Sequence, residues 1–338
     1  MVTNLPDIPP IVREELLQWL GAEPLELARS GLSGAIVIRC RAACGDFCLR
    51  GWPVGTSEEK LRQVYSAIST ARVAGVDVVP AYMVRRADST PWVAAAGRFW
   101  ELTEWMPGRA DYLEHPDVDR LQDVCLRLGT LHRLWRRQTH RIPLPSPGVQ
   151  RRLQLLARKL EELSADCHDP WYLVPEYAPA SSTIRQLWRQ TMEHTRRCGP
   201  ELLQELNRIA TVPVEQHFVI RDLHSEHVLF IDKRVTGIID FGASGIDEPL
   251  MDLVRLLSTM EPFGNHWEVA LAVYESTAEL QIDRRRLQAI DAVSCLLSAW
   301  QWCQWLVVEG RQFSQPLPTL LERWRRQLAR LPILPSVA

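Results

Sequence analysis

The chain has 338 residues, of which 46% are hydrophobic and 24% charged, a composition that supports a sizeable buried core in two lobes or domains. The 39 basic and 41 acidic residues nearly cancel, which excludes a strongly basic surface for nucleic acid or an anionic membrane. Residues 1–21 lack a basic region followed by an apolar core, and no run approaches the ~18 apolar residues of a membrane span, so we expect a cytoplasmic protein without a signal peptide.

The eight cysteines invite a disulfide or metal interpretation that their spacing does not support. Cys40, Cys44 and Cys48 follow a C-x3-C-x3-C pattern, whereas structural zinc pairs use C-x2-C and the common iron–sulfur spacings also differ. The other cysteines are scattered along the chain. We therefore expect reduced, mostly buried thiols.

The first hundred residues alternate apolar and polar side chains and are rich in β-branched residues, which favours an antiparallel sheet. The expected strands cover residues 24–30, 35–41, 47–52, 76–84 and 98–106. One helix interrupts them, for which Ser57 suits the N-terminus and Gly75 the C-terminal cap. The turn at 106–111 marks a boundary.

Beyond this turn the pattern becomes helical. One apolar face recurs at helical spacing in residues 118–135 and comprises Leu121, Cys125, Leu128, Leu131 and Trp135. A charged helical pair follows at 149–167 and 183–199, either a hairpin or an insertion that flanks the site. Further helices are expected at 248–260, 266–280 and 287–310. Trp300, Trp302 and Trp305 in the last of these are more typical of a helix–helix core than of a platform for a substrate ring.

Two acidic residues bracket a short predicted hairpin. Asp222 precedes the strand "HVLFID", and Asp240 ends the returning strand "VTGIID", so a hairpin of this length brings both carboxylates to the same edge. Phosphoryl transfer needs one group to orient and deprotonate the attacking hydroxyl and one carboxylate to hold the metal on the phosphates. Asp222 suits the first role and Asp240 the second, and Gly242 allows a sharp turn after the metal ligand.

The segment "RDLHSEHVLF…RVTGIIDFGASGIDEPLMDL" resembles the catalytic segment of the aminoglycoside phosphotransferase and choline-kinase-like family, within the protein-kinase-like fold. The resemblance implies that Asp222 is the catalytic base, preceded by the supporting Arg221, and that Asp240 with Gly242 forms the metal-binding motif. It also implies that Asp252 braces the catalytic loop.

Weaker matches follow in the expected order between residues 25 and 260. "SGLSGAIVIRC" resembles the loop that covers the nucleotide phosphates, which implicates Ser33 and Gly34, and "FCLRGW" places Arg50 where the family has its phosphate-binding cation. "WELTEWMPG" resembles the hinge. This match implies that the backbone of three consecutive residues holds adenine, namely Glu104, Trp105 and Met106.

The chain departs from the family pattern at several positions. Ile220 stands where the family usually has His, and no acid is evident in the first helix to pair with Arg50, since Gln63 or Tyr65 falls there. His227 replaces the Asn that normally binds a second metal ion. An imidazole can ligate a metal through nitrogen, although Mg²⁺ prefers oxygen, so the site would use one metal or favour Mn²⁺.

Two other functions remain open at this point. A catalytically impaired nucleotide-binding protein, or scaffold, on the same fold would retain these residues without turnover. Alternatively, Asp222, His224 and His227 have the D-x-H-x-x-H spacing of a hydrolytic metal site, although no motif supplies a nucleophile or base for it.

The sequence therefore predicts an α+β, bilobal protein-kinase-like fold. Residues 1–21 would form an N-terminal helix or extension, 22–105 a small lobe with a five-stranded antiparallel sheet, and 106–338 a helical lobe that carries the catalytic segment 217–252. ATP with Mg²⁺, or Mn²⁺, is the expected cofactor, and the expected partner is a small-molecule hydroxyl acceptor. The pattern identifies neither that acceptor nor the oligomeric state.

Overall fold

A computed structural model describes residues 8–21, 26–30, 34–84, 90–138, 142–164, 181–261, 265–313 and 315–331. Its contacts divide the chain into two compact units. The first unit comprises Met1–Gln138, Ile220–Gly245 and Ala272–Glu279, and the second comprises Thr139–Val219, Ile246–Leu271 and Leu280–Ala338. The segment with the two acidic residues of the predicted hairpin thus belongs to the same unit as the N-terminal sheet.

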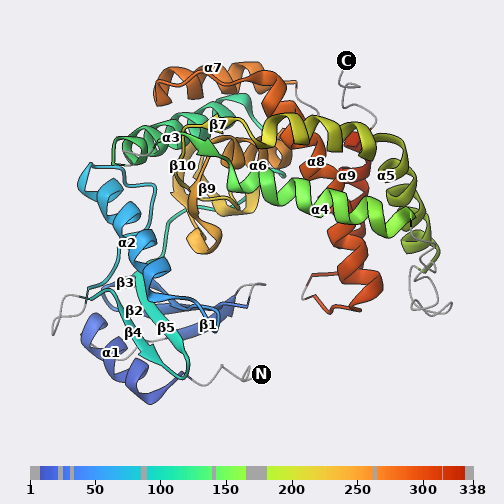
Figure 1. Cartoon of the computed structure of the whole chain (residues 1–338). Helices are drawn as coiled ribbons and strands as arrows, with labels where there is room; N and C mark the ends of the chain where they lie inside the picture. Colours follow the sequence, from blue (N-terminus) through green and yellow to red (C-terminus); the bar gives the residue numbers. More distant parts are fainter. Residues whose placement is uncertain are drawn as a thin grey trace. The chain divides into compact units, whose positions relative to one another are not determined.

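The first unit contains the predicted five-stranded antiparallel sheet, drawn in blue to cyan in Figure 1. Its strand order is β1-β2-β3-β5-β4. The strands are β1 (Glu26–Ser30), β2 (Ile36–Ala42), β3 (Gly45–Gly51), β4 (Trp92–Ala95) and β5 (Arg98–Glu104). Because β5 pairs with β3, residues about fifty positions apart in the chain lie directly opposite each other.

One face of this sheet packs against the helix α1 (Pro10–Leu20). Buried side chains of both elements form a single apolar cluster, which includes Val12, Leu16, Ile38 and Trp100. A Cβ on Gly51 would lie 3.0 Å from the indole of Trp100, closer than an ordinary contact, so glycine at the end of β3 allows this packing without displacement of the ring.

The strand predicted at 76–84 was wrong. Val78 and Val79 are buried, as their apolar character requires, but the segment forms turns, and Tyr82 makes only an isolated bridge to Thr103. Pro80 has no N–H to donate to a ladder, which explains why pairing fails there. The edge strand of the sheet is instead β4, whose sequence Trp-Val-Ala-Ala carries a weaker strand signal.

Two further helices, α2 and α3, belong to the first unit. The helix α2 (Glu58–Val73) begins at the predicted cap, where Ser57 Oγ accepts a hydrogen bond from the Lys60 N–H at 3.2 Å. The helix α3 (Val118–Gln138) buries the whole predicted apolar face, each of its five side chains being at most 1% exposed. The indole N–H of Trp135 donates to the main-chain oxygen of Ala67 at 3.0 Å and so joins the two helices.

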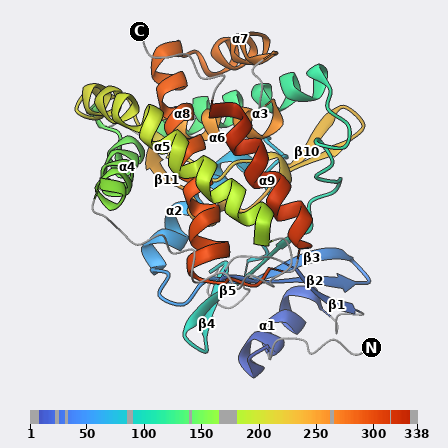
Figure 2. The ribbon, with the colours of Figure 1, turned by 90° about the vertical axis from the view of Figure 1, so that its right-hand side faces the viewer.

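The second unit is mainly helical. Figure 2 shows its long helices α4, α5, α8 and α9 packed together, and each of these packs on at least one of the others. Their bounds are α4 (Pro147–Ser164), α5 (Ser181–Ala210), α8 (Arg284–Cys303) and α9 (Leu317–Arg330), with α6 (Leu250–Met260) packed on α8. The helix α7 (Trp267–Ala278) spans the boundary between the units in the sequence. The charged pair predicted before residue 200 corresponds to α4 and α5, which pack on each other.

Trp300 donates its indole N–H to Thr195 Oγ1 at 2.8 Å and is 7% exposed, in agreement with the predicted helix–helix core. The prediction was wrong for Trp302 and Trp305, which are only half-buried and pack edge to face against each other. Four short two-residue or three-residue strands also occur in the second unit or at its edge: β6 (Leu144–Pro145), β7 (Pro213–Val214), β8 (His217–Val219) and β11 (Gly245–Asp247).

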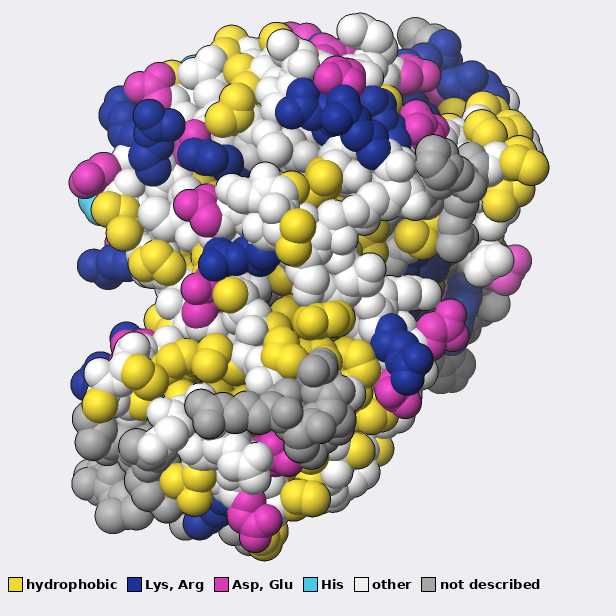
Figure 3. All heavy atoms as spheres, turned by 90° about the vertical axis from the view of Figure 1, so that its left-hand side faces the viewer, with side chains coloured by type: hydrophobic (Ala, Val, Ile, Leu, Met, Phe, Trp, Pro, Cys, Tyr) yellow, Lys and Arg dark blue, Asp and Glu magenta, His cyan; other side chains and the backbone are white. Residues whose placement is uncertain are grey.

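Charges of both signs are interspersed on the surface. On the face in Figure 3, Lys and Arg side chains alternate with Asp and Glu, as the near-neutral net charge implies. None of the described helices has the length and apolar composition needed to cross a membrane.

Candidate active site

A two-stranded ribbon positions both acidic residues, as the sequence predicts. It consists of β9 (Val228–Ile231) and β10 (Arg234–Ile238), paired antiparallel through a turn at Asp232. The Ile239 N–H donates to the main-chain oxygen of His227 at 3.0 Å, which extends the pairing to the open end of the ribbon. Asp240 and the loop that carries Asp222 therefore meet at this end.

Asp240 is the most constrained residue of the site. Its backbone has φ 59° and ψ 72°, a left-handed conformation that costs a non-glycine residue free energy and is frequent at functional sites. Its Oδ1 accepts hydrogen bonds from Arg50 Nη2 at 2.8 Å and from the Gly242 N–H at 3.1 Å. Although burial opposes ionisation, the Arg50 guanidinium holds the pKa of Asp240 below its ordinary value, so the carboxyl is ionised at neutral pH.

His227 lies between the two acidic residues. Its Nδ1 is 2.8 Å from the main-chain oxygen of Asp222, and because a carbonyl only accepts, Nδ1 carries a proton. In the neutral ring the other nitrogen, Nε2, presents a lone pair, and it lies 3.7 Å from Asp240 Oδ2. A neutral imidazole and an ionised carboxylate in this arrangement can ligate one divalent cation, with a nitrogen in place of the amide oxygen of the family pattern.

Asp222, His224 and His227 also lie together, each offering a ligand atom within 4.8 Å of the others. His224 Nδ1, however, accepts the main-chain N–H of Glu226 at 3.3 Å, which leaves the proton of the neutral ring on Nε2. Its ring also stacks on that of His227 at 3.8 Å between centroids. Without a free lone pair, His224 is a poor third ligand, and this argues against a hydrolytic metal site.

An open pocket of about 510 Å³ contains both carboxylates. Its lining comprises Arg50, Trp52, Pro53, Thr56, Ser57, Lys60, Asp222, Asp240, Gly242 and Ala243. The guanidinium of Arg50 lies over the Trp52 ring, 4.6 Å from its centroid, which fixes the cation at the wall of the pocket. All of these residues belong to the first unit, so a single compact part of the chain provides the two acids and a cation.

The buried acid near Arg50 is Glu101, which the sequence did not reveal. It lies directly opposite Arg50 in the pairing of β3 with β5 and is 4% exposed. Burial raises the pKa of Glu101 to about 7, while the nearby Arg50 lowers it. A signal was present: Trp100 and Leu102 face the α1 cluster, so alternation places Glu101 on the other face of the sheet. The two α2 residues that the sequence places at the position of the Arg50 partner lie elsewhere. Tyr65 packs against Tyr82, and Gln63 is on the exposed side of α2.

The predicted hinge residues lie outside the lining of this pocket. The Glu104 N–H donates to the Ala81 main-chain oxygen at 2.9 Å, and the Trp105 N–H donates to that of Asp46 at 3.0 Å. Among the described residues, the Met106 N–H has no such partner. In the predicted phosphate loop, Ser33 lies outside the described residues, and the Gly34 main-chain oxygen accepts a hydrogen bond from Arg98 at 2.9 Å.

The predicted supporting residues Arg221, Gly242 and Asp252 differ in their surroundings. Arg221 has φ 66°, and its guanidinium passes close to Gly245, where a Cβ would come within 2.9 Å of it. A Cβ on Gly242 would lie 2.6 Å from Arg50 Nη2, so glycine at this position leaves room for the guanidinium where it is. Asp252 is fully buried in the first turn of α6.

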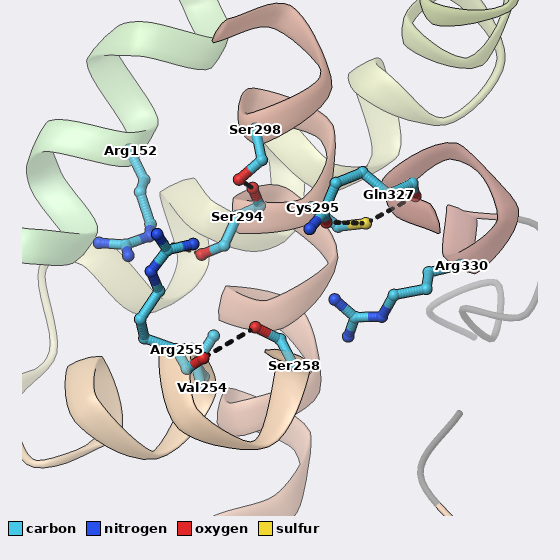
Figure 4. A pocket seen from close by; sticks show the side chains of 9 residues that line it. All are labelled: Arg152, Val254, Arg255, Ser258, Ser294, Cys295, Ser298, Gln327 and Arg330. Atoms are coloured by element: carbon cyan, nitrogen blue, oxygen red, sulfur yellow. Dashed lines mark hydrogen bonds between the residues drawn. The ribbon is translucent and has the colours of Figure 1, made fainter. Parts of the chain in front are cut away.

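A second, much smaller pocket lies among the helices of the second unit (Figure 4). Its volume of about 20 Å³ admits little more than one water molecule. Arg152 and Arg255 reach into it, but the hydroxyls of Ser258, Ser294 and Ser298 all donate to helix carbonyls. Because the three hydroxyls already donate their protons to helix carbonyls and the space is so small, we assign no ligand to this second pocket.

Comparison with known proteins identifies the family of the chain. The model of the phosphotransferase enzyme family matches residues 25–290, more than half of the chain. The chain belongs to this phosphotransferase family. A search of curated protein sequences gave no match.

Solved structures share the fold at low sequence identity. A spectinomycin phosphotransferase in complex with ADP and spectinomycin is 11% identical, with a TM-score of 0.68 over 97% of this chain and 98% of that one. An aminoglycoside phosphotransferase from Alicyclobacillus acidocaldarius is 10% identical, with a TM-score of 0.59 over 98% and 94%. A microcompartment-associated aminopropanol kinase is 16% identical, with a TM-score of 0.59 over 95% and 94%. The predicted family and the protein-kinase-like fold are therefore confirmed.

Proposed function

We propose that this phosphotransferase moves the γ-phosphate of ATP to a hydroxyl of a small molecule. The observation that carries the proposal is the single pocket of about 510 Å³ lined by Asp222, Asp240 and Arg50. Structural relatives in complex with ADP and spectinomycin, or acting on aminopropanol, support nucleotide use and a small acceptor.

Each residue then has a distinct role. Asp222 accepts the proton of the acceptor hydroxyl as its oxygen bonds to the γ-phosphorus, and the bond from that phosphorus to the bridging oxygen breaks to release ADP. Arg50 binds phosphate oxygens. Asp240 and His227 would hold a divalent metal, which when bound supplies positive charge against the phosphates. The Met106 N–H offers a hydrogen bond to the adenine.

Substitution of the two acids tests these roles. We expect Asp222→Asn to retain stabilisation by ATP but to lose turnover by roughly 10²–10⁴-fold, since a general base is removed. Asp240→Asn should lose the metal-dependent part of ATP binding. Asp232→Asn is the matched control, because Asp232 lies at the exposed turn of the same ribbon. The measurements are thermal stabilisation by nucleotides with Mg²⁺ or Mn²⁺ and ATP consumption over a panel of hydroxylated metabolites.

The alternative is a nucleotide-binding protein without turnover, which His227 in place of the usual Asn favours. Binding of ATP without consumption for any acceptor, in either metal, would identify this alternative. Tight Zn²⁺ binding with no response to nucleotide would instead contradict the whole proposal and indicate a hydrolytic metal site.

A further inference from the structure

Lys60 lies in the same pocket as the two acids. It belongs to the first turn of α2, and its side chain lines the pocket with Arg50, Asp222 and Asp240. The ammonium donates hydrogen bonds to the main-chain oxygen of Ser244 and to its hydroxyl, the latter at 3.3 Å. Both of these partners are neutral.

Within the part of the chain that the structure describes, Lys60 has no ion pair, whereas the other two lysines of the chain do. Lys159 pairs with Glu162 at 2.7 Å, and Lys233 pairs with Asp117 at 3.0 Å and with a second aspartate.

The surroundings of Lys60 add positive charge. Burial and, to a smaller extent, the guanidiniums of Arg221 and Arg50 together lower the pKa of Lys60 to about 8. The charged groups that face it are Arg50 from β3, Arg221 and Asp222 from the catalytic loop, and Asp240 after β10. An anion bound in the pocket would offset this repulsion, and the existing partners hold the ammonium at the pocket wall until it arrives.

We infer that Lys60 is a second phosphate-binding residue of this site and contacts the phosphate that is transferred. The inference rests on the proposed function. The transferred phosphate is favoured over the other two because Lys60 shares its pocket with Asp222, the residue that receives the hydroxyl proton at that phosphorus. Arg50 and Lys60 then act on one phosphoryl group from two elements, β3 and α2.

The test compares Lys60→Met and Lys60→Arg with Arg62→Met, an exposed residue of the same helix that pairs with Glu58. Loss of a charged hydrogen bond should lower kcat/KM for ATP roughly ten- to a hundredfold in Lys60→Met. Stabilisation by ADP should change little, because ADP lacks the contacted phosphate. Lys60→Arg should recover part of the activity, and Arg62→Met should stay within about twofold of wild type.

The pH profile separates phosphate binding from a purely structural tether to Ser244. Wild-type kcat/KM should fall above about pH 8 as the ammonium deprotonates, and this limb should be absent in Lys60→Arg, whose guanidinium stays charged. Unchanged kcat/KM for ATP in Lys60→Met, or an equal loss of stabilisation by ATP and by ADP, would refute the role of Lys60 and leave the proposed function standing. A wild-type protein that binds no nucleotide would refute both this role and the proposed function.

Discussion

Replacement of Glu101 by Gln should remove a pH-dependent destabilisation of the first unit. Burial raises the pKa of Glu101 from its ordinary 4.5 to about 7, even though Arg50 lies opposite it. At 1.36 kcal/mol per pH unit, this difference of about 2.5 units corresponds to about 3 kcal/mol. Because the folded-state pKa is raised, the contribution of Glu101 to stability is fully present below pH 4.5 and is lost as pH rises through 7.

The assay is chemical denaturation between pH 4.5 and 8, with amide hydrogen exchange in β3 and β5 to report on this sheet specifically. The free energy of unfolding of Glu101→Gln, relative to wild type, should rise by up to about 3 kcal/mol across this range. Glu59→Gln, an exposed residue of α2, is the control and should show no such trend. A constant difference between Glu101→Gln and wild type at every pH would show that Glu101 ionises normally and would refute the argument.

Three further changes test the site and the helical unit. His227→Asn should raise activity with Mg²⁺ relative to Mn²⁺ in turnover assays, and loss of turnover would mean that the imidazole has a role of its own. Gly242→Ala should displace Arg50, whose Nη2 would lie 2.6 Å from the new Cβ; we expect several-fold weaker ATP binding and a cost of about 1 kcal/mol, and unchanged binding would contradict this. Arg330→Met should lower the free energy of unfolding, measured by chemical denaturation, by about 3–5 kcal/mol, because the buried Asp291 loses its two hydrogen bonds from Arg330, at 2.8 and 2.6 Å. The double variant Arg330→Met with Asp291→Leu should restore most of this loss, and a loss below about 1 kcal/mol in the single variant would refute the reasoning.

Local patterns predicted much of the fold. The ribbon before Asp240 and the apolar face of α3 follow from periodicity within one segment, so the sequence sufficed for both. The strand predicted at 76–84 was wrong because the apolar residues there reflect burial and not strand pairing. Val78 and Val79 are buried without a ladder.

The site residues that were missed depend on long-range geometry. Glu101 meets Arg50 only through the register of β3 with β5. Lys60 reaches the pocket only because of the orientation in which α2 packs near the 241–244 turn. Spacing along the chain encodes neither relation. The proximity of Asp222 to Asp240, by contrast, was predicted because one short ribbon determines it.

The ion pair between Arg50 and Asp240 has a consequence for the order in which ligands enter. A bare divalent cation on Oδ2 would compete with the guanidinium on Oδ1 for the single charge of Asp240, and so would weaken the counterion of Arg50 in a partly buried place. A metal–nucleotide chelate brings phosphates that give Arg50 a new partner in the same event. We therefore expect weak affinity for the bare metal and steep cooperativity between metal and nucleotide, which calorimetric titrations of each alone and of both together would quantify.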